Sequence, residues 1–173
     1  AVIVDNSFDY EASPLHHEYF DWYTYGGIIR PVALHRLPEI WVESVTARIE
    51  DWKNGALTLD IVWGREEDGP PKAALRVIID GETVNEQQLR LKSTEGQLQV
   101  DVVVPDPTPW MPDTPNLHTI EVRLGDDDLI ERIGLREIKV EGTEVLLNEE
   151  PIFMAGVNRH EAHPEFGHSV PLG

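Results

Sequence analysis

The densest group of residues that could bind a metal lies toward the C-terminal end of the sequence. His160, Glu161 and His163 are close neighbours, and His168 follows them. A zinc protease site needs two His four positions apart on one helix face, with a Glu between them as the base. Here the two His are three positions apart and Pro164 follows directly, so both the spacing and the helix fail. We therefore expect no metal and no cofactor.

A second candidate for chemistry is the loop at 20–27, which reads Phe-Asp-Trp-Tyr-Thr-Tyr-Gly-Gly. Aromatic rings can cover the apolar face of a sugar, while a carboxylate such as that of Asp21 accepts hydrogen bonds from the hydroxyl groups. The same rings could equally pack a seam between two domains. Asp21 is therefore a candidate substrate-binding residue, and both interpretations stay open.

A third candidate follows the apolar run at 152–157. Such a run is typical of a strand that is buried on both faces, as in a parallel sheet. In a (β/α)8 barrel, the residues just after a strand line the mouth of the active site. Asn158, Arg159 and His160 take that place here, and their polar groups suit a hydroxyl-rich ligand. The alternative interpretation is a polar loop at the end of a strand.

The remaining acidic residues form no recognisable catalytic pair. Hydrolysis of a glycoside with retention needs two carboxyl groups about 5–5.5 Å apart, flanking the bond. The acids of 39–137 fall mostly on turns and on strand faces expected to meet solvent. The sequence shows neither a nucleophile elbow nor a glycine-rich phosphate loop. We therefore assign no catalytic residue within this chain.

The elements that must position these residues belong to an acidic, cysteine-free chain of 173 residues. Thirty-two Asp and Glu stand against 14 Lys and Arg, for a formal net charge of −18, which disfavours nucleic acid and anionic membranes as partners. Only four of the basic residues are Lys, a pattern that fits either a salt-adapted source or an ordinary acidic protein. No apolar run could span a membrane and no signal peptide is visible, so we expect a cytoplasmic protein.

Short alternating runs separated by turn signals fill the middle of the chain. Leu57, Leu59, Ile61 and Trp63 show the period of two that is typical of a strand with one buried face. Strands are predicted at 40–49, 56–63, 73–80, 83–91, 98–104, 117–124 and 129–138. This number of strands over about 100 residues indicates an all-β fold, an immunoglobulin-like β-sandwich.

The two flanks differ from the middle. Runs at 1–4 and 28–37 are predicted strands. Because proline donates no ladder hydrogen bond, Pro31 predicts that the second strand lies at an edge or begins near that residue. Residues 140–147 are predicted to form a hairpin. A single strand of parallel type at 152–157 is expected to be the first strand of a following domain.

Two motifs near the ends of the sequence resemble those of a known family. Residues 21–32 read Asp-Trp-Tyr-Thr-Tyr-Gly-Gly-Ile-Ile-Arg-Pro-Val, and resemble the signature that closes the sugar-binding jelly roll of glycoside hydrolase family 2. Residues 148–161 are similar to the segment that leads into that family's catalytic barrel, with Glu149 and Glu150 in place of Gly-Lys. Residues 110–124 also resemble a family segment, although His118 stands where Tyr is common, and 134–137 resemble the stretch that leaves the sandwich.

The resemblance implies three parts. These are the C-terminal end of the sugar-binding jelly roll at 1–37, an immunoglobulin-like β-sandwich at 38–138, and the truncated start of the catalytic TIM barrel at 139–173. It implies a retaining hydrolase of β-galactosides or β-glucuronides whose two catalytic Glu lie beyond this chain. Asp21 and His160 match positions that contact the substrate, and Asn158 and Arg159 flank the second of them.

Other functions fit part of this pattern. A non-catalytic carbohydrate-binding or adhesion module would explain the sandwich and the acidic surface, but not a buried-type strand followed by Asn-Arg-His. Residues 38–138 are expected to act as an interdomain scaffold even in an enzyme, and the fragment alone is expected to be inactive. The expected partner of the full-length enzyme is a carbohydrate substrate, and a homo-oligomer is expected.

Overall fold

The computed structural model describes residues 2–5 and 26–169. The chain divides into two compact units, Arg36–Met154 and a second unit of Ala1–His35 with Ala155–Gly173. All the strands named below belong to the Arg36–Met154 unit. Among the described residues there is no helix of the length and apolar character needed to cross a membrane.

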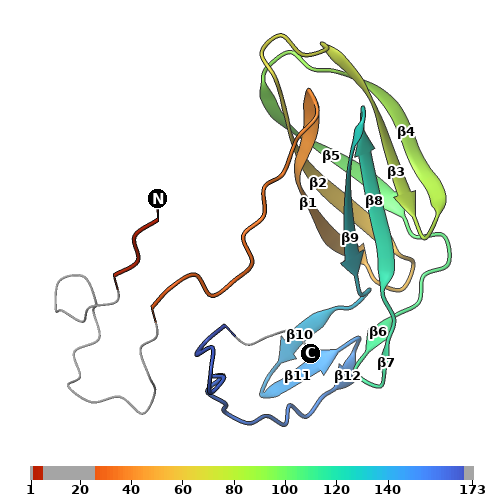
Figure 1. Ribbon diagram of the computed structural model, residues 1–173. Coiled ribbons are helices and arrows are strands. Elements are labelled where there is room, and N and C mark those ends of the chain that lie inside the picture. The colour runs from red at the N-terminus through yellow and green to blue at the C-terminus, as the bar shows by residue number, and fades with distance from the viewer. Residues whose placement is uncertain (1, 6–25, 170–173) are drawn as a thin grey trace. The chain divides into compact units, whose positions relative to one another are not determined.

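Seven strands form two antiparallel sheets that make a β-sandwich (Figure 1). One sheet has the order β1-β2-β5 and the other β4-β3-β8-β9. The all-β sandwich expected from the sequence is thus confirmed, and each of its strands overlaps one of the seven predicted runs. Their bounds are β1 Ile40–Asp51, β2 Ala56–Arg65, β3 Lys72–Ile79, β4 Glu82–Arg90, β5 Glu95–Val103, β8 His118–Leu124 and β9 Asp127–Ile133.

Side chains that alternate along the strands form the core between the two sheets. Leu57, Leu59 and Ile61 of β2 are buried together with Leu75 and Val77 of β3 and with further apolar residues of β8. Each such side chain stabilises the fold by about 1.5–3 kcal/mol through removal of apolar surface from water. The period of two read from the sequence therefore identified the buried face correctly.

A β-bulge keeps the first strand facing this core along its whole length. The register of β1 against β2 shifts between Val42 and Ser44. Ile40 and Val42 are buried before the shift, and Val45 and Ala47 pack against the core after it. An extra residue in one strand reverses which face its side chains take, so both apolar series point inward.

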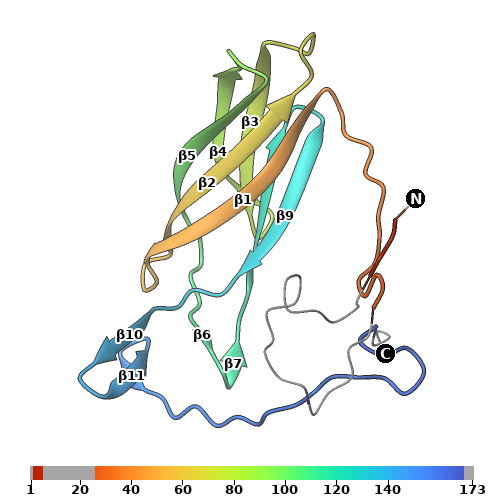
Figure 2. The same cartoon turned by 90° about the vertical axis from the view of Figure 1, so that its left-hand side faces the viewer.

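Two smaller elements follow at one end of the sandwich (Figure 2). Strands β6 Trp110–Met111 and β7 Thr114–Pro115 pair with each other, and β10 Ile138–Glu141, β11 Glu144–Leu147 and β12 Glu150–Pro151 form a three-stranded sheet. The predicted hairpin at 140–147 is confirmed by the pairing of β10 with β11.

Three predicted strands do not form in the described residues. Residues 2–5, 28–37 and 152–157 are irregular, and Phe153 and Val157 are 93% and 94% exposed. A strand takes its backbone hydrogen bonds from neighbouring strands. Among the described residues, none of the three runs belongs to a sheet, although the Ile152 N–H donates to the Val145 carbonyl oxygen at the end of the hairpin. The apolar composition of these runs predicted that their side chains would be buried. A side chain is buried only where another part of the protein packs against it.

The predicted strand at 129–138 is instead divided in two. Strand β9 ends at Ile133, and β10 begins at Ile138. Between them Gly134 lies against the indole of Trp110, where an added Cβ would come within 2.7 Å of the ring. Leu135 is fully buried and pairs with Pro109 in an isolated parallel bridge. The close packing against Trp110 accounts for the break.

Candidate functional site

The predicted substrate-binding residues fall in the second unit of the chain. Asp21 lies outside the described residues. Asn158, Arg159 and His160 follow one another on an irregular, solvent-exposed segment rather than at the end of a strand. The Arg159 side chain is 75% exposed, and its Nε lies 3.8 Å from the Oε1 of Glu161. This segment offers polar and cationic groups to solvent.

The His-rich tail folds into a local turn. His163 and Gly167 exchange backbone hydrogen bonds of 2.7 and 2.9 Å, with Gly167 at a positive φ of 58°. The backbone N–H of Glu165 donates to His163 Nδ1 at 3.1 Å, and His168 Nδ1 lies 3.0 Å from the carbonyl oxygen of Glu161. These ring nitrogens thus serve the turn. Nowhere in 2–5 or 26–169 do three or more His, Cys, Asp or Glu gather where they could hold a metal ion.

The chain reaches this segment through the tight turn between β11 and β12. Leu147 pairs with Glu150, so Asn148 and Glu149 are the two central residues of the turn. Both have positive φ values, 52° and 70°. Two positive φ values are typical of a type I′ turn, which favours Asn at the first position and Gly at the second. Glu149 therefore adopts a conformation that a residue with a Cβ rarely takes.

Asn148 fixes this turn from the inside. Its side chain is buried, and its Oδ1 accepts the backbone N–H of Glu137 at 2.8 Å. Its Nδ2 donates to the carbonyl oxygen of Trp110 at 3.1 Å, and its own backbone N–H donates to the Glu137 carbonyl at 2.9 Å. Asn148 thus joins the turn to the segment that leads into β10 and to β6.

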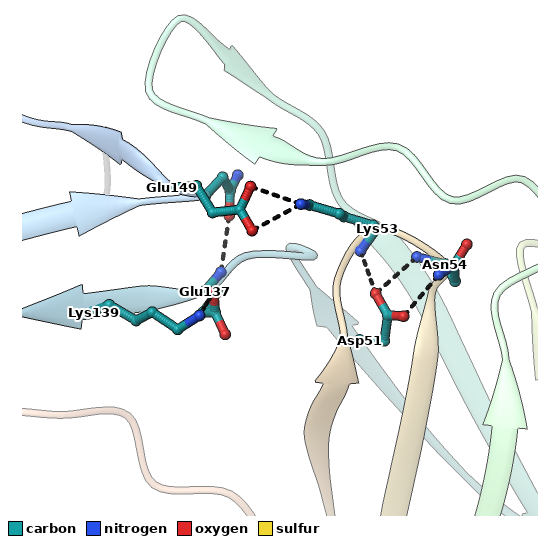
Figure 3. A network of polar contacts seen from close by, with 7 residues as sticks. Asp51, Lys53, Asn54, Glu137, Lys139 and Glu149 are labelled. Atoms are coloured by element: carbon teal, nitrogen blue, oxygen red, sulfur yellow. Dashed lines mark hydrogen bonds and ion pairs between the residues drawn. The ribbon is translucent and has the colours of Figure 1, made fainter.

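Glu149 fixes the same turn from the outside, through an ion pair with Lys53 (Figure 3). Lys53 Nζ lies 2.8 and 2.6 Å from the two carboxylate oxygens. The hydrogen bond from Lys53 and its charge lower the pKa of Glu149, and the nearby charge of Lys139 lowers it further. Lys139 is itself paired with Glu137 at 2.8 Å, which raises the pKa of Lys139.

The turn that carries Lys53 is itself preorganised by Asp51 (Figure 3). Its Oδ1 accepts the backbone N–H groups of Lys53 at 2.9 Å and of Asn54 at 3.1 Å, and its Oδ2 accepts the Asn54 side-chain amide at 2.7 Å. The hydrogen bonds from Asn54 are the main reason that the pKa of Asp51 is lowered. The ammonium group therefore extends from a fixed backbone.

A second polar centre joins β8 to the turn after β3. His118 is 4% exposed, and its Nδ1 lies 2.6 Å from Asp80 Oδ2. The other oxygen of Asp80 accepts the backbone N–H of Thr119 at 2.8 Å, and His118 Nε2 lies 3.2 Å from both the backbone nitrogen and the carbonyl oxygen of Thr108. Both ring nitrogens of the buried imidazole are thus satisfied.

Both polar centres escaped the sequence analysis. Glu149 was noted only as a departure from Gly, and His118 only as a departure from Tyr. The available signal for the first was the Asn-Glu pair between two apolar runs, which is a turn dipeptide with an unfavourable second member. No signal in the sequence paired Asp80 with His118 or Lys53 with Glu149, because each pair is far apart along the chain.

The sequence of this chain is similar to a known family and to named relatives. The family model for Glycosyl hydrolases family 2 matches residues 40–136. A beta-glucuronidase of Paenibacillus borealis is 30% identical over 152 residues, which cover 83% of this chain and 24% of that protein. A beta-galactosidase of Streptococcus thermophilus is 26% identical over 156 residues, covering 87% of this chain and 15% of the relative.

A solved structure extends the likeness along almost the whole chain. The crystal structure of a GH2 beta-galacturonidase from Eisenbergiella tayi, bound to galacturonate, has 31% sequence identity and a TM-score of 0.82. The match covers 97% of this chain and 31% of that one, so the chain spans less than a third of the length of the relatives it matches. The family resemblance carried by the end motifs is confirmed, and the chain belongs to glycosyl hydrolase family 2.

Proposed function

We propose that this chain is part of a retaining hydrolase of β-glycosides. The observation that carries the proposal is the match to family 2. In addition, relatives named as a beta-glucuronidase and a beta-galactosidase align with most of this chain. The sandwich serves as the scaffold that holds the segments on either side of it. The chain alone is proposed to be inactive, because the family resemblance implies that the two catalytic Glu required for such a reaction lie outside it.

The preferred substrate is a β-linked uronic acid, either galacturonide or glucuronide. A structural match over 97% of this chain is to a galacturonidase, and the relative with 30% identity over 152 residues is a glucuronidase. A uronate carboxylate needs a cationic partner, and a guanidinium binds it with two parallel hydrogen bonds. Arg159 supplies an exposed guanidinium beside His160, on a chain whose net charge of −18 would otherwise repel an acidic sugar.

Substrate choice is tested with the full-length protein that contains this chain. Its kcat/KM is measured on aryl β-galacturonide, β-glucuronide and β-galactoside. We expect hydrolysis of a uronide to exceed that of the galactoside by about tenfold or more, since a hydrogen bond to a charged group contributes about 1.5–3 kcal/mol. Hydrolysis of the galactoside alone would refute the uronide assignment, and no hydrolysis of any of the three would refute the proposed function.

Asp21 and His160 are the proposed substrate contacts, and both are tested by substitution. In the full-length protein, Asp21→Ala and His160→Ala are each expected to lower kcat/KM at least about tenfold, which is about 1.4 kcal/mol of transition-state stabilisation. His163→Ala is the matched control, because that imidazole serves the local turn. Unchanged kinetics in both test variants would assign structural roles to Asp21 and His160.

A further inference from the structure

We infer that Lys53 and Glu149 are positioning residues, whose ion pair holds the β11–β12 turn against the β1–β2 turn and so fixes where the chain leaves the hairpin toward residues 158–160. The consequence for activity rests on the proposed function. The structural part stands on contacts within the Arg36–Met154 unit alone. Neither residue touches a substrate in this inference, so neither is a catalytic residue.

The backbone of Glu149 shows why its side chain matters. At a φ of 70°, a glycine would be free of the strain that a Cβ introduces. A glycine, however, would present no carboxylate to Lys53. In Figure 3 the Glu149 carboxylate is directed at the Lys53 ammonium, with both oxygens within hydrogen-bonding distance. The strained conformation is thus coupled to one specific contact.

An exposed ion pair usually contributes little, because two long side chains must be ordered to form it. Here the backbone at both ends is already ordered, so only the two side chains remain to be ordered when the pair forms. The backbone at Lys53 is held by Asp51, and the residue before Glu149 is held by the buried Asn148 amide network. The two charged groups therefore join two preformed turns.

The position of this turn determines the start of the segment that carries the proposed substrate contacts. Beyond the turn, β12 ends at Pro151, and the backbone N–H of Ile152 donates to the carbonyl oxygen of Val145 at 2.9 Å. No strand follows, and residues 152–162, which include His160, are irregular. The point at which the chain leaves the hairpin is therefore set by contacts within the Arg36–Met154 unit. Small displacements of a substrate contact cost large factors in rate.

The experiment combines kinetics with hydrogen exchange in the full-length protein. The variants are Glu149→Gln, Lys53→Met and the charge-swapped double variant Lys53→Glu with Glu149→Lys, and Glu150→Gln is the matched control on the neighbouring acid of the same turn. Each single variant is expected to lower kcat about threefold to tenfold with KM within about twofold. Amides of 145–152 are expected to exchange faster in the single variants. The double variant should recover both properties, and the control should change neither.

Several results would overturn the inference. One is single variants that lower only the melting temperature while kcat, KM and exchange at 145–152 stay at wild-type values. Another is a double variant that recovers neither rate nor protection, because the charge pair would then not be the cause. If the wild-type protein hydrolyses no glycoside, the proposed function fails, while the exchange measurements still decide whether the ion pair holds the turn.

Discussion

At the scale of single residues, the His118–Asp80 pair shows how a buried polar group is accommodated in an all-β core. His118 donates from Nδ1 to Asp80, and its Nε2 can accept from the Thr108 N–H or, when protonated, donate to the Thr108 carbonyl. Burial alone raises the pKa of Asp80, but hydrogen bonds from His118 and from the Thr119 N–H together outweigh it, so the pKa is lowered. The charged form of Asp80 is thus favoured in the folded state.

A substitution at Asp80 tests this reading. Asp80 has a positive φ of 50°, which Asn also tolerates, so Asp80→Asn removes the charge with little change of shape. At neutral pH the free energy of unfolding of the variant is expected to be about 1–3 kcal/mol lower than that of the wild type, because the buried imidazole no longer has a charged acceptor for its hydrogen bond. Urea unfolding followed by tryptophan fluorescence measures the difference.

The pH dependence of that difference has a definite sign. A folded-state pKa below the ordinary value of 3.8 means that the unfolded chain binds the proton more readily. The stabilisation by Asp80 is therefore complete above pH 3.8 and is lost as the pH falls from there through the lowered pKa. The gap between wild type and Asp80→Asn should narrow in that acid range. A gap that stays constant into acid would contradict the assignment.

Residue-level prediction from the sequence succeeded where a local pattern carried the information. The buried positions Leu57, Leu59 and Ile61 followed from alternation, because the strand geometry alone decides which face a side chain takes. Glu149 and Asp80 could not be predicted in the same way. Their partners lie on other elements. Asp80-Gly81 is a favoured turn pair and indicates the turn, but not the partner of the Asp80 carboxylate, whereas Glu149 has a positive φ at a position where a turn prefers glycine.

At the scale of elements, pairs of Trp and Gly fix the register of the first sheet. Trp41 on β1 is the direct partner of Gly64 on β2, and Trp63 on β2 is the direct partner of Gly96 on β5. In both pairs an added Cβ on the glycine would lie 2.4 Å from the Cζ2 of the facing indole. Each ring therefore covers a glycine that leaves room for it.

This arrangement predicts unequal costs for two similar substitutions. Gly96→Ala is expected to destabilise the chain by about 1–3 kcal/mol, because Trp63 is buried in the core and cannot move aside without strain. Gly64→Ala should cost less, because Trp41 is only half buried and its ring can turn outward. Thermal unfolding of both variants measures the order. Gly156→Ala is the control, since nothing lies within 4 Å of its added Cβ. Equal losses at 64 and 96 would contradict the explanation.

The elements themselves were predicted well only where they pair within this chain. The seven sandwich strands alternate along the sequence and find their partners in it. The runs at 28–37 and 152–157 carry as much apolar character, yet they remain irregular, because a strand is defined by neighbours as well as by its own residues. The predicted site at 158–160 depends on the second of these runs, so its placement at a barrel mouth stays a prediction.

At the scale of the whole molecule, the balance of charge is the dominant feature. The net charge is −18, and several of the carboxylates that do find partners do so at the exposed surface, as in the Lys53–Glu149 and Arg76–Glu86 pairs. Most of the remaining acidic groups repel one another across the folded surface. Self-repulsion of this kind destabilises a compact state more than an expanded one.

Added salt should therefore stabilise the folded chain. Screening at about 0.1 M already reduces the range of the repulsion to about 10 Å, so the melting temperature should rise steeply at low salt and level off below about 1 M NaCl. Thermal unfolding across a salt series measures this, and a matched series in a neutral osmolyte separates screening from preferential exclusion. A continued rise into molar salt would indicate adaptation to a saline environment, and a melting temperature that does not rise would show that surface repulsion is not what limits stability.

Added salt should have the opposite effect on the Lys53–Glu149 ion pair, since screening weakens the attraction between two exposed opposite charges. Protection of the amides at 145–152 should thus fall over the same range in which the sandwich gains stability.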